Sequence, residues 1–467
     1  MERERAAASI VSLSDVLSSM SYALDLTEGQ PAGHAVRSCV IGMRLADAVG
    51  LASEERAALY WALLLKDVGS SVNAAMVSEF YGSDDHEVKR DLKTTNWTRR
   101  ADRVVHALRN AARGRPFTER VRQVVSMANG GSNVARAMVR MRCERGADIV
   151  TALGFPDSTA SSIRALDEHW DGSGHPNGLA GEAIPMAARI VALAQTVEVY
   201  LRQGGPRAAL GVVRARRGSW FDPALADEAA SWADDRSWWD AVRHASARTM
   251  VLDLEPSDRA RTVDAEGLDR IAEAFAEIID AKSPYTYQHS AKVAAYATGL
   301  ARSLGLDAAT QRTLYRAALL HDIGKLGVSS RILDKPGSLT AAERRAVERH
   351  PALTWQILLE VSAFESFAAI AATHHERLDG KGYPWRLSGP HLELPARVLA
   401  VADRYEALTA DRPYRAALSR TAALAILRAA SGRAVDGAVV DALRRNIGAV
   451  EAGAVDRSTR RFGTSAA

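Results

Sequence analysis

The chain has 467 residues, of which 47% are hydrophobic and 25% are charged, and these values exclude a disordered or fibrous protein. Its formal charge of +4 is too weak to indicate binding to a nucleic-acid polymer. Because the length exceeds what one ordinary hydrophobic core accommodates, we expect two sizeable domains.

The N-terminal stretch predicts no secretion signal, since it carries charges of both signs and Ser and Asp interrupt its apolar residues. No uninterrupted apolar run reaches the length of about 18 residues that indicates a membrane span. The two cysteines, Cys39 and Cys143, are too few for a disulfide framework and fit a reducing compartment. We therefore expect a soluble, cytoplasmic protein.

Apolar residues recur three and four positions apart through most of the chain, as in LDRIAEAFAEIIDA, whereas alternating patterns are scarce. This periodicity predicts an all-α fold. Clusters of Gly and Pro, such as RQGGPRAA, DGSGHPNGLAGEAIP and DGKGYPWRLSGPHLELP, predict the main loops. We expect functional residues at the helix ends that face these loops.

The two halves of the chain repeat one another. His34 and Asp67 are 33 residues apart, as are His289 and Asp322, and LLLKDVGS in the first half corresponds to ALLHDIGK in the second. Further on, LDEHWDGSGHPNGLAGEAIPMAARIVALAQTVE aligns without a gap to HHERLDGKGYPWRLSGPHLELPARVLAVADRYE. Between these blocks the first copy is about 47 residues longer, and we assign the excess to residues 89–133.

The repeat predicts two homologous helical bundles in tandem. We expect a first domain at residues 1–235, a linker at 236–261, a second domain at 262–449 and a C-terminal tail at 450–467. The linker is placed where a stretch containing Trp and Arg follows the last segment that both halves share.

Seven imidazole and carboxylate side chains lie within the apolar helical segments of the second copy. They are His289, His321, Asp322, His350, His374, His375 and Asp403. A single residue of this kind is usually a satisfied core residue, but seven would be unfavourable to bury unless something common compensated them. Imidazoles and carboxylates without thiolates suit iron, manganese or zinc in a hydrolytic site. The pattern therefore predicts a metal centre.

Asp322 is the candidate bridge between two ions, because it follows His321 near the predicted end of a helix and its carboxylate has two oxygens. Two ions roughly 3.5–4 Å apart lower the pKa of a shared water and neutralise phosphate oxygens during in-line attack. The hypothesis is phosphodiester hydrolysis with Asp322 as a catalytic residue.

The order and surroundings of these residues resemble the HD-GYP family of HD phosphohydrolases. The resemblance rests on HDIGKLGVSSRILDKPGSLTAAERRAVERHP, HHERLDGKGYP and ARVLAVADRYEALTADRPYR, and it covers most of residues 262–449. It implies a helical bundle around a metal centre that hydrolyses cyclic di-GMP, or in some members cyclic GMP-AMP, to a linear dinucleotide or mononucleotides. The seven residues resemble the metal ligands of this family.

The resemblance also assigns roles around the metals. Lys325 would approach the scissile phosphate as a catalytic and substrate-binding residue. The other substrate-binding positions are Gly382, Tyr383, Pro384, Arg412 and Arg415, the two arginines matching positions that contact phosphates. Because Tyr285 stands where members with three metals carry Glu, we expect two divalent ions, iron or manganese, with other transition metals as alternatives.

The first copy retains His34 and Asp67 but has lost most of the ligand set. The residues aligned with His321, His374, His375 and Asp403 are Lys66, Leu166, Asp167 and Gln195. His169 and His175 do not lie at ligand positions, and we expect them to be loop histidines. We expect this half to be non-catalytic, as a regulatory domain that binds a nucleotide or as a module that binds a second copy or a signalling protein.

Two alternatives to a cyclic-dinucleotide phosphodiesterase stay open. One is a nucleotide receptor with little turnover, and the other is a phosphohydrolase of a different nucleotide, since the HD pair also occurs in such enzymes. The intact ligand set argues against the first, and the GYP and RPYR motifs argue against the second. Cyclic di-GMP is the first expectation for the substrate, and the tandem arrangement mildly strengthens the case for cyclic GMP-AMP, the second candidate.

Overall fold

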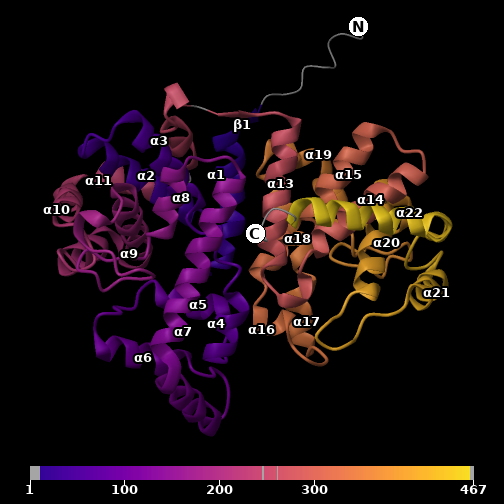
Figure 1. Cartoon of the computed structure of the whole chain (residues 1–467), viewed down its shortest axis with the longest axis horizontal. Coiled ribbons are helices and arrows are strands. Elements are labelled where there is room, and N and C mark those ends of the chain that lie inside the picture. The colour runs from indigo at the N-terminus through magenta and orange to yellow at the C-terminus, as the bar shows by residue number, and fades with distance from the viewer. Residues whose placement is uncertain (1–10, 245–246, 260, 463–467) are drawn as a thin grey trace. The chain divides into compact units, whose positions relative to one another are not determined.

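The computed structural model describes residues 11–244, 247–259 and 261–462. The chain forms two compact units, residues 1–264 and 265–467, and nearly all regular structure in the described part is helical (Figure 1). The prediction of an all-α fold with two helical bundles is confirmed. Among the described helices, none is long and apolar enough to cross a membrane.

The first unit is a bundle in which α2, α3 and α9 pack together and bury Ile41, Leu63 and Leu193. Its helices are α1 (Leu13–Thr27), α2 (His34–Ala48), α3 (Ser53–Leu65), α4 (Ala74–Tyr81), α5 (Asp85–Leu92), α6 (Arg100–Asn110), α7 (Phe117–Ala152), α8 (Asp157–Arg164), α9 (Met186–Ala215), α10 (Pro223–Ser231), α11 (Arg236–Arg243) and α12 (Ala247–Asp253). Strands β1 (Val11–Ser12) and β2 (Thr262–Val263) pair antiparallel, with Val11 opposite Val263.

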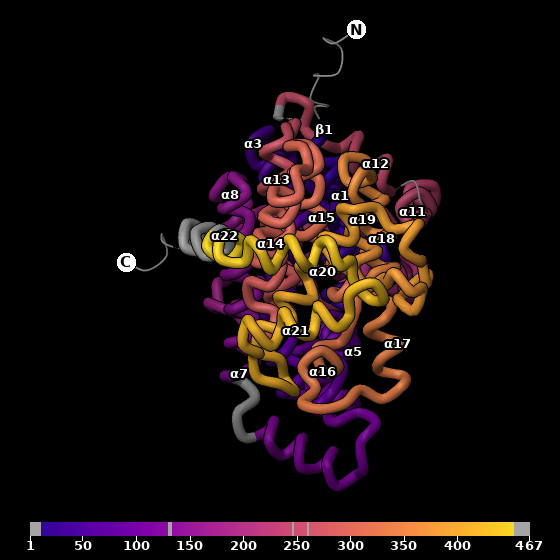
Figure 2. Tube along the Cα trace, turned by 90° about the vertical axis from the view of Figure 1, so that its right-hand side faces the viewer, coloured from indigo at the N-terminus to yellow at the C-terminus, as the bar shows by residue number. Residues whose placement is uncertain are grey.

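The second unit repeats this arrangement around α14, against which α15, α20 and α22 pack. Its helices are α13 (Ala265–Asp280), α14 (His289–Ser303), α15 (Ala308–Leu320), α16 (Ser330–Leu333), α17 (Ala341–Glu348), α18 (His350–Leu359), α19 (Glu365–Ala372), α20 (Leu394–Thr409), α21 (Arg420–Ala430) and α22 (Gly437–Phe462). Figure 2 shows α22 running across α14 and α20. Short 3₁₀ turns include η5 (Ile323–Gly327), which follows the His-Asp pair.

Residues 236–261 are not the linker that the sequence predicts. They contain α11 and α12, which pack on α2 and bury Trp239, Val242 and Val251. The apolar side chains of this segment explain the difference, because they are removed from water only by packing on the first unit.

Two further boundaries also differ from expectation. The tail expected from residue 450 begins inside α22, where Val450 is buried beside Gly299. RQGGPRAA is not an open loop but a break within α9, where Gly204 and Gly205 leave helical geometry before the helix continues. Gly205 has a φ of +74°, which glycine adopts without the steric cost that a side chain would add.

A buried carboxylate orients the first histidine of each repeat. In the first unit His34 Nδ1 and Glu198 Oε2 are 2.5 Å apart, and in the second His289 Nδ1 and Glu406 Oε2 are 2.5 Å apart. Each histidine opens a helix, and each glutamate lies on the long helix packed against it. The two units thus keep this pair although most of their other site residues differ.

A second buried glutamate fixes the Gly-rich loop in each unit. Glu168 accepts backbone N–H groups from residues 177–179 at 2.7–3.1 Å, and Glu376 accepts those of Trp385 and Leu387 at 2.8 and 3.0 Å. These bonds satisfy backbone groups that a loop over the core would otherwise leave unpaired. In both units a buried glutamate that accepts backbone N–H groups therefore holds the Gly-rich loop, which is the GYP loop in the second unit.

A buried aspartate binds the first turn of the histidine-bearing helix in both units. Asp25 accepts the N–H groups of His34 and Ala35 at 2.9 and 3.0 Å. Asp280 accepts the backbone N–H and the hydroxyl of Ser290, the shorter distances being 3.1 and 2.7 Å. Burial raises the pKa of both carboxyls to about 7.

The raised pKa of Asp25 predicts a pH-dependent stability. Between the ordinary pKa near 3.8 and the folded pKa near 7, the unfolded chain ionises this group while the folded chain keeps it protonated. The free energy of unfolding of the wild type should therefore fall relative to that of Asp25→Asn as pH rises through this window, by on the order of 1 kcal/mol per pH unit. Denaturant unfolding at several pH values, followed by tryptophan fluorescence, measures the difference, and parallel pH profiles would contradict it.

Candidate metal centre

The structure brings the seven predicted ligands together from separate elements of the second unit. They are His289 at the start of α14, His321 and Asp322 between α15 and η5, His350 at the start of α18, His374 and His375 after α19, and Asp403 within α20. The rings of His321, His350 and His374 have no exposed surface. Apart from Asp403, the site is therefore assembled at helix ends, where a side chain can project into the bundle.

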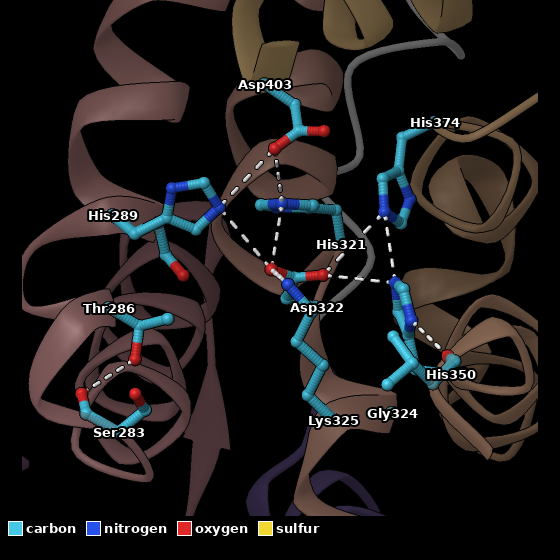
Figure 3. Close-up of polar contacts among 12 residues, drawn as sticks. Ser283, Thr286, His289, His321, Asp322, Gly324, Lys325, His350, His374 and Asp403 are labelled. Atoms are coloured by element: carbon cyan, nitrogen blue, oxygen red, sulfur yellow. Dashed lines mark hydrogen bonds and ion pairs between the residues drawn. The ribbon is translucent and has the colours of Figure 1, made fainter. Parts of the chain in front are cut away.

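The carboxylate of Asp322 lies at the centre of this cluster (Figure 3). Its Oδ2 is 3.4 Å from His289 Nε2 and 3.3 Å from His321 Nε2. Its Oδ1 is 3.2 Å from His350 Nε2 and 3.7 Å from His374 Nε2. Each carboxylate oxygen of Asp322 thus faces a different pair of histidines.

Asp403 and His375 complete the two sides. Asp403 Oδ1 is 3.5 Å from His289 Nε2 and 3.7 Å from His321 Nε2, on the side of Asp322 Oδ2. His375 joins His350 and His374 in a group whose ligand atoms lie within 4.8 Å of one another. His289, His321 and Asp322 form a second group that meets the same limit.

Hydrogen bonds on the far nitrogens orient four of the rings. The Nδ1 atoms of His321, His350 and His374 each lie 2.7 Å from a backbone carbonyl oxygen three residues earlier, while His289 Nδ1 contacts Glu406. An imidazole that donates from Nδ1 presents a free lone pair on Nε2. All four Nε2 atoms face Asp322, as the ligands of a metal require.

Unsatisfied buried atoms provide a test of whether the residues fit a metal. His289 Nε2, His321 Nε2 and Asp322 Oδ1 are buried without a hydrogen-bond partner. Leaving three such atoms unpaired in one cluster is unfavourable, and a cation at the centre would satisfy them. The donor set of imidazole and carboxylate fits a divalent transition metal.

The electrostatics divide the histidines into two groups. Burial would lower the pKa of His289 and His321, but carboxylates, Glu406 for His289 and Asp322 for His321, outweigh it and raise the values to about 9 and about 10. Burial lowers the pKa of His350 and takes that of His375 to about 3. His350 and His375 are therefore neutral and can bind a cation directly, whereas a cation that binds His289 and His321 must displace their protons.

Asp322 remains ionised despite its burial. Desolvation would raise its pKa, but the charges of His321 and Lys325 hold it well below the ordinary range. Lys325 Nζ donates to Asp322 Oδ2 at 2.5 Å, and the lysine side chain is one-fifth exposed. The Lys325 side chain therefore connects the buried cluster with the protein surface.

The predicted substrate residues lie at different distances from this chemistry. The Tyr383 ring packs on the His375 ring with centroids 4.8 Å apart, followed by Pro384 in a cis peptide. A side chain on Gly382 would collide with the backbone of Glu376. The GYP motif thus packs on His375 through the Tyr383 ring and on Glu376 through the backbone of Gly382.

The two predicted arginines differ in their contacts. Arg412 donates to Glu406 Oε2 at 3.0 Å, so it is linked to the cluster through His289. Arg415 donates to the carbonyls of Ala407, Leu408 and Ala416. The structure therefore places the guanidinium of Arg415 on the end of α20 and not on the ligand cluster.

In the first unit, lysine side chains lie at the position that corresponds to the ligand cluster of the second unit. Lys66 pairs with the buried Asp67, and Lys93 Nζ lies 3.4 Å from Asp67 Oδ1. A side chain on Gly69 would collide with the carbonyl of Arg142, as one on Gly324 would with that of His350. Arg142 therefore stands where the second unit has His350, a replacement that the sequence alignment did not resolve.

Sequence reasoning also missed Glu406, which orients His289. Glutamate on a helix is usually a solvated surface residue, so it attracts no attention by itself. A signal was present nonetheless, since Glu198 and Glu406 end the two aligned blocks whereas the metal ligands within those blocks differ.

The comparisons with known proteins agree with this architecture. A family model described as HD domain matches residues 119–225 and 273–439. The 3'3'-cGAMP-specific phosphodiesterase 3 of Vibrio cholerae is 41% identical over 433 residues, which cover 93% of this chain and 94% of that protein. The cyclic di-GMP phosphodiesterase response regulator RpfG of Xanthomonas campestris is 40% identical over 184 residues, or 39% of this chain and 48% of that protein.

A solved structure is similar over both units. The crystal structure of a cyclic GMP-AMP specific phosphodiesterase of Vibrio cholerae, V-cGAP3, has a TM-score of 0.64 and 36% identity. The match covers 94% of this chain and 98% of that one. The resemblance to known proteins therefore includes the first unit as well as the second.

Removing the charge of Asp322 should remove the metal. We expect Asp322→Asn to lose most of the metal that the wild type retains after purification from Mn(II), because the Asp322 carboxylate lies within 3.7 Å of imidazole nitrogens of both histidine groups. Elemental analysis by mass spectrometry measures the content. Asp67→Asn, at the matching position of the first unit, is the control and should retain it; an unchanged content in Asp322→Asn would refute the assignment.

Glu406→Gln should weaken metal binding without removing a ligand. Loss of the carboxylate partner leaves the His289 ring less well oriented, and such changes typically lower metal affinity about 10- to 100-fold. Competition with a chromogenic chelator measures the affinity. Glu198→Gln makes the same change beside His34 in the first unit, and equal effects of the two variants would contradict a specific role for Glu406.

Proposed function

Because the chain belongs to the HD-GYP family of HD domain phosphohydrolases, we infer that it is a metal-dependent phosphodiesterase that hydrolyses a cyclic dinucleotide. The observation that carries this inference is the buried Asp322 carboxylate with one oxygen toward each of two histidine groups. Such a site suits cleavage of a phosphodiester, since both phosphate charge and an attacking water need positive charge nearby.

We propose 3'3'-cGAMP as the preferred substrate. The V. cholerae phosphodiesterase specific for this nucleotide matches 93% of the chain, whereas the cyclic di-GMP phosphodiesterase RpfG matches 39%. Similarity across both units supports a shared specificity better than similarity across a catalytic segment does. This reverses the order expected from the sequence, in which cyclic di-GMP came first.

We assign the seven ligands to two ions, with iron or manganese as the candidates. His289, His321 and Asp403 would hold one ion with Asp322 Oδ2, and His350, His374 and His375 would hold the other with Asp322 Oδ1. When bound, such ions lower the pKa of a water molecule and neutralise phosphate oxygens. The grouping follows the distances in the cluster, and Tyr285 supplies no carboxylate for a third ion.

The chain's own residues would position the phosphate. Lys325 Nζ has one donated bond to Asp322 and an exposed fraction through which it can also donate to a phosphate oxygen. Arg412 has a guanidinium bonded to Glu406, and its remaining N–H groups would donate to a second phosphate. Tyr383 and the rest of the GYP loop would form the wall against which the nucleotide lies.

We propose that the first unit carries out no hydrolysis. Lys66, Arg142 and Gln195 replace three ligands, and Ser70 stands where the second unit has Lys325. An ammonium and a guanidinium cannot bind a cation.

Hydrolysis assays with 3'3'-cGAMP and cyclic di-GMP test the proposal directly. In Mn(II) or Fe(II) we expect the wild type to turn over 3'3'-cGAMP with the higher kcat/KM and to yield a linear dinucleotide, with all activity lost in EDTA. Asp322→Asn should lower kcat by roughly 10³-fold or more, since the reaction loses its metal contribution. Binding without turnover would identify a receptor instead, and turnover of a mononucleotide alone would identify a different phosphohydrolase.

A further inference from the structure

A large cavity lies in the first unit at the position that corresponds to the metal site of the second. Its volume is about 990 Å³, and its lining includes Arg142, Asp167 and Gln195, which align with His350, His375 and Asp403. His175, at the position of Tyr383, also lines it. The first unit has thus lost the metal ligands but retained the hollow around them.

The lining of this cavity is cationic. Five of its residues, Lys89, Lys93, Arg100, Arg103 and Arg142, are basic, against the two carboxylates of Glu28 and Asp167. Glu28 is shared, with Lys93 Nζ at 2.9 Å and Arg142 Nη1 at 3.9 Å. The excess positive charge favours an anionic ligand and supplies locally what the second unit would obtain from metal ions.

Aromatic rings form two sides of the same cavity. Trp97 and Tyr81 both pack edge-on against His106, with centroids 5.1 and 5.3 Å apart. On another side Trp220 stacks on His169 at 4.1 Å. Flat π surfaces of this kind bind nucleobases by stacking.

Buried polar atoms without partners also line the cavity. They are Asn73 Oδ1, His106 Nε2, His175 Nδ1 and Trp220 Nε1, which include a hydrogen-bond donor and an acceptor. Asn73 and His106 are 6% and 2% exposed, so solvent does not compensate them fully. A ligand with both donors and acceptors, such as a purine edge, would satisfy these atoms.

Most of the features that set this cavity apart belong to the inserted segment. Trp97, Arg100, Arg103 and His106 fall within residues 89–133, by which the first copy exceeds the second. The insertion therefore does more than lengthen a loop, because it adds a basic and aromatic wall to the altered site.

We propose that this cavity binds a purine dinucleotide without metal and without hydrolysing it, as a second nucleotide site in each chain. The phosphates lie toward Lys93, Arg142 and Arg103, and a base stacks beside Trp97. The identity of the ligand rests on the proposed function, since it is either the cyclic substrate or the linear product, which share this chemistry. The cavity would not hydrolyse its ligand, because Ser70 stands in place of Lys325 and Gln195 in place of Asp403.

Binding to the full chain carrying Asp322→Ala, in EDTA, tests the proposal apart from catalysis. Titration calorimetry with 3'3'-cGAMP, and separately with its linear dinucleotide, should show saturable binding, and the tighter ligand identifies the occupant. Trp97→Ala and Arg103→Glu should each weaken binding at least about tenfold, since the first removes a stacking surface and the second reverses a charge. Arg122→Glu, an exposed position of the same insertion outside the lining, should bind like its parent.

Absence of binding by both nucleotides, or binding that neither Trp97→Ala nor Arg103→Glu weakens while circular dichroism shows them folded, would overturn the second site. Hydrolysis by the unmodified, metal-loaded protein is measured in parallel. Hydrolysis without metal-free binding would refute this site alone, whereas metal-free binding without hydrolysis would refute the proposed function and keep this site.

Discussion

The second unit depends on one electrostatic constraint, which is an ionised carboxylate buried at the meeting point of several helix ends. Asp322 is 1% exposed and is surrounded by imidazole nitrogens and by the ammonium of Lys325. A buried charge of this kind is tolerated only where positive charge and hydrogen bonds compensate it. The helices that approach Asp322 therefore carry their histidines at the ends, and the rings are oriented from behind by backbone carbonyls and Glu406.

The framework of the fold and the chemistry of the site are carried by different residues. Both units keep a helix-binding aspartate, a histidine–glutamate pair and a glutamate that holds the Gly-rich loop, for example Asp25 and Asp280. These groups bind backbone or orient a helix start, so the bundle needs them even where no metal ligands remain. The ligands themselves can be exchanged, as in the first unit, provided that the new side chains satisfy the same buried space.

Much of the fold could be predicted because helical periodicity and internal repetition are both visible in the chain. The ligand cluster could be predicted because seven polar residues interrupt apolar segments at repeated spacings. The packing of residues 236–261 on the first unit could not be predicted, because the sequence alone does not show which surface the apolar residues of α11 and α12 cover. Arg415 illustrates a related limit, because its guanidinium donates to carbonyls at the end of the preceding helix, α20, a contact that the sequence does not show, and its assignment to the substrate stays a prediction.

The ion pair between Lys66 and Asp67 in the first unit has a consequence for how the duplicated halves can diverge. Both partners are buried, so replacing Lys66 with histidine alone would leave the Asp67 carboxylate with less positive charge nearby, which lowers the stability of the fold. Arg142, Asp167 and Glu28 form a second interdependent group beside it. Changing one of these positions at a time therefore lowers the stability of the chain before a metal can bind. The packing that now fills this space in the first unit thus opposes a return to the residues of the second unit.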